Sequence, residues 1–205
     1  MLYKITIFIV RVLLLILNGF QKYEGQENLP SDKGYVLVAP HRSWLDPVLL
    51  AIAIYPKPVV VMAKQELFKP KPFAWFIKKL GAFPVNREKP SPSVIKHPVK
   101  ELKEKQKALI IFPTGTRYSQ DLKGGAITIA KLSKTTLVPA VYQGPFTLKE
   151  VLLRKKMTVR IGTPIDVSQA KKEDYPMIEQ AMQEQFDTLD QLINPDFVYT
   201  TPTKQ

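Results

Sequence analysis

One of the two histidines in this chain, His41, stands five residues before Asp46 in the segment Pro40-His41-Arg42-Ser43-Trp44-Leu45-Asp46-Pro47. A carboxylate can accept the ring N–H of a histidine and stabilise the imidazolium that forms when the other ring nitrogen takes a proton. The pair is therefore a candidate for activating a hydroxyl group. Because Asp46 precedes a proline, capping of the next helix is its structural alternative, with Ser43 as the cap if Asp46 turns to His41.

A second loop with residues that could take part in chemistry follows an apolar run and extends from Phe112 to Arg117. It offers hydroxyls, backbone N–H groups and a guanidinium together, through Thr114, Gly115, Thr116 and Arg117. A guanidinium matches the oxygens of a phosphate, and a glycine lets the backbone approach a ligand closely. Arg87 stands at the end of a short strand pattern that begins at Gly81. An arginine after a turn, taken alone, is more often an ordinary surface charge.

Several other chemistries are disfavoured. The chain has no cysteine, which excludes disulfides, thiolate metal sites and a cysteine nucleophile, and two histidines argue against a zinc site, so we expect no metal. Ser43 lacks the Gly-x-Ser-x-Gly setting of a nucleophilic serine. His97 has no acidic partner nearby and is expected at the surface, while Trp44 is expected to pack in the core or the loop.

The charge balance predicts an acidic partner. Thirty Lys and Arg against 18 Asp and Glu give a formal net charge of +12. Nucleic acid, an anionic membrane surface and a phosphorylated substrate all fit such a charge. The chain carries no nucleic-acid recognition motif and has an apolar amino-terminal segment, so nucleic acid is not expected.

The amino-terminal segment of 13 residues from Ile5 to Leu17 is apolar except for Thr6 and Arg11. A helix needs about 20 apolar residues to span a bilayer, so this one is expected to enter a membrane interface without crossing it. No small-residue cleavage site follows, which argues against a signal peptide. A buried core helix is the remaining alternative. We therefore interpret residues 1–23 as a membrane-interface anchor helix.

Beyond the anchor, apolar runs of strand length alternate with helical patterns, which predicts an α/β domain over residues 24–205. Strands are expected at residues 35–39, 59–62, 108–112, 136–141 and 157–161, and helices at 47–54, 73–80, 96–107, 125–133 and 175–193. The apolar central strands predict a mostly parallel sheet flanked by helices. Residues 194–205 are expected to fray. Residues 68–80 mix basic and aromatic side chains, as at a headgroup surface or as in an ordinary helix with an aromatic buried side.

Together and in order, these segments resemble the glycerolipid acyltransferases, specifically the 1-acyl-sn-glycerol-3-phosphate acyltransferases. Four blocks carry the resemblance: the HxxxxD block from His41 to Asp46; Lys64–Phe68 with Gly81–Arg87; Phe112–Arg117; and Val138-Pro139-Ala140. Several matched blocks in the right order are far more specific than any one of them. The resemblance covers about residues 24 to 166.

This resemblance implies acyl transfer from acyl-acyl carrier protein or acyl-coenzyme A, as co-substrate and without a further cofactor, to the sn-2 hydroxyl of lysophosphatidate. His41 is then the general base and Asp46 orients it. Arg87 and Arg117 are expected to hold the substrate phosphate, with Lys123 adding charge. The loop of Thr114, Gly115 and Thr116 is expected to contact the acceptor and stabilise the oxyanion.

Thr114 departs from the family pattern, because the third block usually reads Phe-Pro-Glu-Gly-Thr-Arg. Two alternatives therefore stay open: an acyltransferase for another lysophospholipid or lyso-aminolipid, and a catalytically silent membrane-surface binding protein. The apolar helix and the positive charge place the expected enzyme at the cell membrane, peripheral or monotopic. The basic flanks Lys4 and Lys22 favour the cytoplasmic face.

Overall fold

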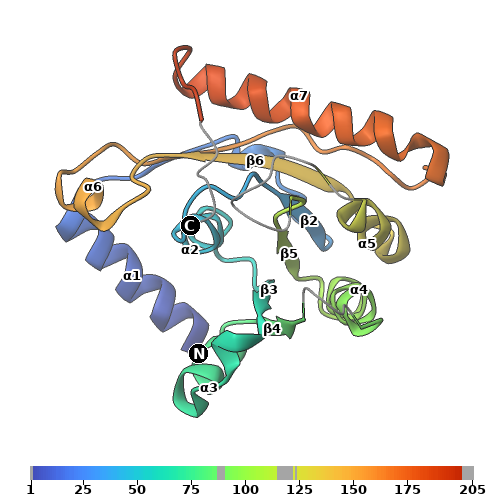
Figure 1. Cartoon of the computed structure of the whole chain (residues 1–205), viewed down its shortest axis with the longest axis horizontal. Coiled ribbons are helices and arrows are strands. Elements are labelled where there is room, and N and C mark those ends of the chain that lie inside the picture. Colours follow the sequence, from blue (N-terminus) through green and yellow to red (C-terminus); the bar gives the residue numbers. More distant parts are fainter. Residues whose placement is uncertain (1, 87–90, 115–121, 123, 200–205) are drawn as a thin grey trace.

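A seven-stranded, mostly parallel sheet lies at the centre of the computed structural model, which describes residues 2–86, 91–114, 122 and 124–199 (Figure 1). The strands are β1 (Lys22–Glu24), β2 (Tyr35–Val38), β3 (Val59–Lys64), β4 (Ala82–Val85), β5 (Ala108–Ile111), β6 (Leu137–Gln143) and β7 (Thr158–Ile161), in the order β1-β7-β6-β2-β5-β3-β4. Strands β6 and β7 pair antiparallel, and the other neighbours pair parallel. The predicted α/β fold with a mostly parallel sheet is confirmed.

Helices cover both faces of this sheet. They are α1 (Leu2–Asn18), α2 (Asp46–Ala53), α3 (Lys71–Lys79), α4 (Ser93–Lys105), α5 (Gly125–Ser133), α6 (Leu148–Leu152) and α7 (Tyr175–Ile193), with short 3-10 turns η1 (Gln26–Asn28), η2 (Gln65–Phe68) and η3 (Lys172–Asp174). The five helices predicted beyond the anchor segment are present. The sequence patterns missed β1 and α6, because segments of three and five residues carry too little periodicity to be recognised.

The central strand β2 shows how the layers are built. All four of its residues are buried, and their side chains alternate between the two faces of the sheet. Tyr35 and Leu37 belong to a core cluster shared with α1 and α2, whereas Val36 and Val38 belong to a second cluster shared with α4, α5 and α7. A strand buried on both faces reads as a continuous apolar run, which is why the sequence predicted its place at the centre.

The carboxyl ends of four neighbouring parallel strands meet at one edge of the sheet. These strands are β2, β5, β3 and β4. The loop after β2 carries His41, the loop after β5 carries Thr114, and Asn86 follows β4. Ligand sites of open α/β sheets lie at this edge, so the fold brings three of the predicted blocks together.

Gly81 fixes the turn that leads from α3 into β4. Its φ is +97°, and a Cβ atom at this position would lie 2.1 Å from the carbonyl oxygen of Val59. A side chain is therefore excluded for two reasons, the backbone conformation and the close approach to β3. This turn sets the start of β4 against β3 and so directs Asn86 to the carboxyl edge of the sheet.

Helix α1 is apolar around most of its circumference, but only one side of it packs on the domain. Ile7 and Leu14 are buried in the first core cluster. The opposite side is exposed, at Ile5, Phe8, Ile9, Val12, Leu13, Leu15 and Ile16. The alternative of a buried core helix is thus correct for one face only. In the described part of the chain, no helix combines the length and apolarity that crossing a membrane requires.

The carboxyl-terminal segment departs from the expectation that residues 194–205 fray. Phe197 and Tyr199 fold back and place their rings 5.1 and 5.2 Å from the guanidinium carbon of Arg42. The prediction of fraying is therefore wrong for residues 194–199, because aromatic rings gain from covering a cation. Residues 200–205 lie outside the described residues.

Candidate active site

His41 and Asp46 form a direct hydrogen-bonded pair. His41 Nδ1 lies 2.9 Å from Asp46 Oδ2, the carboxylate is 1% exposed, and the histidine side chain is 17% exposed. An ionised carboxylate only accepts hydrogen bonds, so Nδ1 carries the proton and Nε2 keeps its lone pair. The pair therefore has the tautomer and orientation that proton abstraction by Nε2 requires.

Asp46 is not a helix cap. It is the first residue of α2, and the residue at the N-cap position, Leu45, makes no side-chain cap hydrogen bond. The Asp46 carboxylate turns back into the preceding loop, where its Oδ2 also accepts from the backbone N–H groups of Arg42 at 2.6 Å and Ser43 at 2.8 Å. Its Oδ1 is buried and finds no hydrogen-bond partner within the described residues.

Ser43 supports the same loop from inside. It is fully buried, and its hydroxyl accepts a hydrogen bond from the backbone N–H of Leu45 at 3.2 Å. Ser43 thus bonds within the loop and does not replace Asp46 as a cap. Trp44 between them is 52% exposed, so it does not pack in the core.

Phe112 connects the first predicted block to the third. Its ring stacks on the His41 imidazole, with 4.3 Å between centroids and 22° between planes. The stacking limits rotation of the imidazole about χ2 and leaves its edge, with Nε2, as the reactive side. It also brings the chain that continues to Thr114 beside His41, and Thr114 itself is 5% exposed.

Two sets of predicted residues are concerned here, the three phosphate ligands and two residues of the acceptor loop. Arg87, Gly115, Thr116, Arg117 and Lys123 lie outside the described residues. Their roles remain predictions from the sequence.

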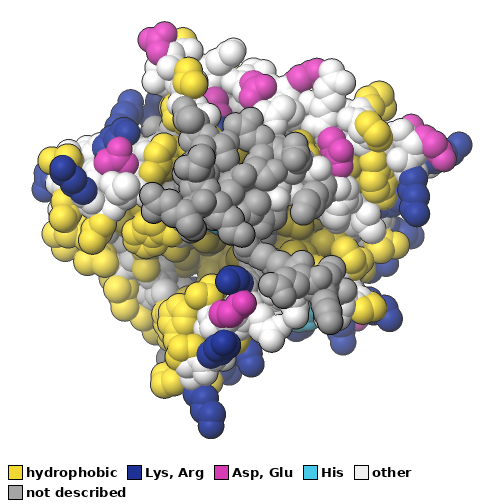
Figure 2. Space-filling view, in the orientation of Figure 1, with side chains coloured by type: hydrophobic (Ala, Val, Ile, Leu, Met, Phe, Trp, Pro, Cys, Tyr) yellow, Lys and Arg dark blue, Asp and Glu magenta, His cyan; other side chains and the backbone are white. Residues whose placement is uncertain are grey.

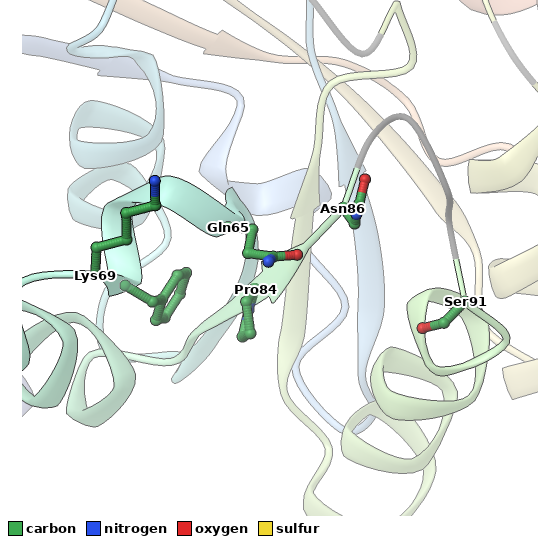
Figure 3. A pocket seen from close by; sticks show the side chains of 6 residues that line it. Gln65, Lys69, Pro84, Asn86 and Ser91 are labelled. Carbon is green, nitrogen blue, oxygen red and sulfur yellow. The ribbon is translucent and has the colours of Figure 1, made fainter.

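An open pocket of about 540 Å³ lies where the second predicted block meets the carboxyl edge of the sheet. It is lined by Gln65, Phe68, Lys69, Pro84, Asn86 and Ser91. Figure 3 shows Gln65 and Pro84 between Lys69 on one side and Asn86 on the other. The ammonium and the amides can donate hydrogen bonds to an anionic ligand. Arg87, a predicted phosphate ligand, directly follows Asn86 in the chain.

Over residues 2–86, 91–114, 122 and 124–199, no cluster of three or more His, Asp or Glu side chains is arranged to hold a metal ion. The second histidine, His97, is exposed, and its ring contacts the ring of Phe83 with 4.6 Å between centroids. The arrangement at His41 is that of an acid–base site.

Comparison with known proteins gives the family. The profile described as Acyltransferase matches residues 21–143, which include β2, the His41 loop, Phe112 and β6. The chain belongs to this acyltransferase family. The 1-acyl-sn-glycerol-3-phosphate acyltransferase of Streptococcus pneumoniae is 44% identical to it over 187 residues, covering 89% of this chain and 71% of the relative. The protein of that name from Bacillus subtilis is 46% identical over 166 residues, covering 80% and 82%.

A solved structure of low sequence identity shares the fold of this acyltransferase. The 1-acyl-sn-glycerophosphate (LPA) acyltransferase PlsC from Thermotoga maritima matches with a TM-score of 0.74 at 20% identity, covering 97% of this chain and 81% of that one. This similarity confirms the α/β architecture and the presence of an amino-terminal helix.

The sequence patterns overlooked two charged residues of this acyltransferase site. Arg42, directly after His41, forms an ion pair with Asp190 in the last turn of α7. A basic residue inside the HxxxxD block and an acidic residue next to the apolar stripe of α7 were visible in the sequence. Their pairing was not, because 148 residues separate them.

Proposed function

We infer that this chain is a 1-acyl-sn-glycerol-3-phosphate O-acyltransferase, which acylates the sn-2 hydroxyl of lysophosphatidate and forms phosphatidate. Two bacterial relatives with that name match most of the chain at 44% and 46% identity. The observation from the geometry that carries the proposal is the contact between His41 and the buried Asp46, at the edge of the sheet where ligands bind.

The proposed reaction uses His41 as general base. Nε2 removes the proton of the acceptor hydroxyl while its oxygen attacks the carbonyl carbon of an acyl thioester, from acyl carrier protein or coenzyme A. The thiolate leaves, taking a proton from the imidazolium, and the ester bond is complete. General base catalysis of this kind contributes about 10²–10⁴-fold. Asp46 stabilises the imidazolium, and no acyl-enzyme is needed because the substrate supplies the hydroxyl.

We propose that the acceptor phosphate binds beyond the pocket of Gln65, Lys69 and Asn86. Arg87 and Arg117 are its proposed ligands, with Lys123 adding charge and the loop of residues 114–116 facing the acceptor and the oxyanion. Support comes from the carboxyl edge of the sheet, where the loops after β2, β4 and β5 converge. The stack of Phe112 on His41 brings the start of the third block to the base.

The acceptor assay tests this function. The purified chain in detergent micelles receives an acyl thioester and either lysophosphatidate or lysophosphatidylcholine of the same chain length. We expect transfer to lysophosphatidate, because the phosphate monoester carries the charge that arginines recognise. Transfer only to lysophosphatidylcholine would mean that Thr114 marks a changed acceptor, and transfer to neither would favour a silent binding protein.

We also propose that the enzyme binds one leaflet of a membrane, on the cytoplasmic face, through the exposed side of α1 and its neighbour α6. Figure 2 shows hydrophobic side chains gathered along α1 and around α3, with Lys and Arg at their borders. The division into residues 1–23 as interface helix and residues 24–205 as catalytic domain belongs to this proposal. Phe73 and Trp75 of α3 are 47% and 59% exposed, which supports a headgroup contact over a buried aromatic side.

Helix α6 supports this membrane proposal because it extends the apolar side of α1. Asn18 at the end of α1 is buried and donates to the carbonyl oxygens of Val151 at 3.1 Å and Lys155 at 3.0 Å. Exposed leucines and cations lie close together along the segment, at Leu148, Lys149, Leu152, Leu153, Arg154, Lys155 and Lys156. Apolar side chains bordered by cations are typical of a surface that binds anionic lipid.

A further inference from the structure

A buried ion pair joins the last turn of α7 to the loop that carries His41. Both Nη atoms of Arg42 donate to the carboxylate of Asp190, with 2.8 Å between Nη1 and Oδ1. The two side chains are only 8% and 9% exposed. The guanidinium is therefore committed inside the protein and is not available to hold a substrate phosphate.

Neighbouring groups enclose the pair. The side-chain amide of Gln143 donates to both the carboxylate Oδ1 and the backbone oxygen of Asp190, each at 2.8 Å. Arg42 Nη1 also lies 3.4 Å from the carbonyl oxygen of Tyr142. The rings of Phe197 and Tyr199 cover the guanidinium from the side of the carboxyl terminus. Strand β6, helix α7 and the chain beyond it thus converge on one residue of the loop.

The position of Asp190 is unfavourable by itself. A carboxylate in the last turn of a helix is repelled by the negative end of the helix dipole, and burial of the charge adds a desolvation cost. Replacing a buried ion pair by apolar residues is often neutral for stability or even stabilising. The pair therefore calls for an explanation other than stability.

The backbone of Arg42 supplies that explanation. Its N–H donates to Asp46 Oδ2 at 2.6 Å, and the same oxygen accepts from His41 Nδ1 at 2.9 Å. A shift of the Arg42 backbone would move the donor that orients Asp46 and, through Asp46, the imidazole. We propose that Asp190 and Gln143 act through Arg42 as positioning residues, which hold the His41–Asp46 pair in its reactive geometry.

This proposal rests on the proposed role of His41 as base, and it predicts an effect on turnover. The pair does not touch the substrate in this account, so its loss should leave KM for lysophosphatidate unchanged. A displacement of about 1 Å between reacting groups costs about 10²-fold in rate. We therefore expect kcat to fall by 10- to 100-fold when the pair is removed and the fold is kept.

The test is the double variant Arg42→Met/Asp190→Leu, which removes both charges together and leaves no unpaired charge in the interior. Its kcat and KM are measured with lysophosphatidate in detergent micelles, and its thermal midpoint is measured in the same detergent. A matched control is Arg160→Met/Glu24→Leu, which removes an arginine–carboxylate pair between β7 and β1. These strands lie two and three places from β2 in the sheet, and no hydrogen bond of the described residues joins their pair to Arg42 or Asp190. For Arg42→Met/Asp190→Leu, we expect a thermal midpoint near that of the parent, an unchanged KM and a reduced kcat. For the control, we expect an unchanged kcat.

A second variant, Gln143→Met, removes two hydrogen bonds to Asp190 and keeps both charges, so it decides the question if the double variant unfolds at the assay temperature. We expect its kcat to fall several-fold at constant KM. Parent values of kcat in both variants would overturn the positioning role. His41→Ala is assayed in parallel: if it stays active, the proposed base is wrong, whereas an inactive His41→Ala beside fully active pair variants refutes only the positioning role.

Discussion

At the scale of single residues, the site is defined by one carboxylate oxygen. Asp46 Oδ2 accepts from the His41 ring and from two backbone N–H groups, all within the loop that precedes α2. Three donors on one oxygen fix the direction of the carboxylate. A second loop, through Phe112, restrains the same imidazole by stacking. These contacts favour the tautomer of His41 that carries its proton on Nδ1.

The variant Asp46→Asn tests this carboxylate. An amide has no negative charge to stabilise the imidazolium, and its NH₂ group favours the wrong histidine tautomer. In hydrolases with a Ser-His-Asp triad, the corresponding change lowers kcat by about 10⁴-fold. We expect a fall of at least about 10²-fold in kcat for acyl transfer, with the thermal midpoint measured alongside. Unchanged turnover in the folded variant would show that Asp46 serves the loop only.

Among single residues, the sequence predicted one contact of the site correctly and gave no indication of another. The spacing of His41 and Asp46 predicted a contact, since a turn brings residues five apart together. The same spacing did not reveal the direction of the Asp46 carboxylate, and helix capping stayed open until its hydrogen bonds were known. The pairing of Arg42 with Asp190 depends on how α7 crosses the sheet, which no local pattern encodes.

At the scale of elements, α4 is held to the sheet by a buried acid. Glu101 is 6% exposed and pairs with Lys105 at 2.7 Å and Lys107 at 2.6 Å. Burial raises the pKa of Glu101, but hydrogen bonds from the two ammonium groups outweigh it and leave the pKa below its ordinary value of 4.5. A lowered pKa means that this stabilisation is present above about pH 4.5 and is lost as the pH falls further.

We therefore expect Glu101→Gln to lower the free energy of unfolding by about 1.5 to 3 kcal/mol at pH 7, the range of hydrogen bonds to charged groups. The difference from the parent should shrink below about pH 4.5. Denaturant unfolding at neutral and acidic pH measures both. Glu104→Gln is the control, because its pair with Lys100 is about 60% exposed on both sides and should contribute little. Equal effects of the two substitutions would contradict the role given to burial.

The proposed membrane surface also belongs to the scale of elements, and α6 tests it. Leu152 and Leu153 are 59% and 70% exposed. Each leucine that enters the lipid interface contributes about 1 kcal/mol or more, so Leu152→Ser/Leu153→Ser should weaken binding to anionic vesicles by about tenfold or more. Sedimentation with phosphatidylglycerol vesicles measures this.

Leu192→Ser is the matched control for α6. Leu192 is 57% exposed, but it lies near the end of α7, on the other side of the sheet from α1 (Figure 1). The vesicle affinity of this variant should equal that of the parent. A loss as large as that of the α6 variant would mean that exposed leucines act without regard to position, and the proposed surface would be wrong.

At the scale of the whole molecule, charge and shape act together. The formal charge of +12 favours an anionic surface, and each basic side chain near such a surface contributes about 1 kcal/mol. Salt screens this attraction, because the Debye length falls from about 10 Å at 0.1 M to 3 Å at 1 M. Apolar contacts through α1 are insensitive to screening.

Vesicle binding should therefore have two components. We expect the affinity for anionic vesicles to fall steeply between 0.1 M and 1 M salt and then level off at a residual, salt-resistant value. Truncating exposed apolar side chains of α1, with Phe8→Ser/Ile16→Ser, should lower the residual value. Binding that disappears entirely at high salt would leave α1 without a role in it.

The fold was predictable at this scale because its central strands are buried on both faces and read as apolar runs separated by amphipathic helices. The amphipathic pattern of residues 175–193 predicted α7 with its observed bounds, and Ile178, Met182 and Phe186, spaced by four residues, lie in its buried stripe. Strand order was not predictable, since β6 pairs parallel with β2 and antiparallel with β7, and such pairing is decided between distant segments. The strand order brings the loops after β2, β4 and β5 to the same edge of the sheet, so the meeting of the three sequence blocks there could not be predicted without it.

The central claim is that His41 is the base in acyl transfer to lysophosphatidate, and the two histidines of the chain allow a direct measurement. Turnover is compared among the parent, His41→Ala and His97→Ala in the same micelles. We expect His41→Ala to lose about 10²–10⁴-fold in kcat and His97→Ala, on the exposed side of α4, to keep the parent rate. Retained turnover in a folded His41→Ala, or equal losses in both variants, would contradict the account.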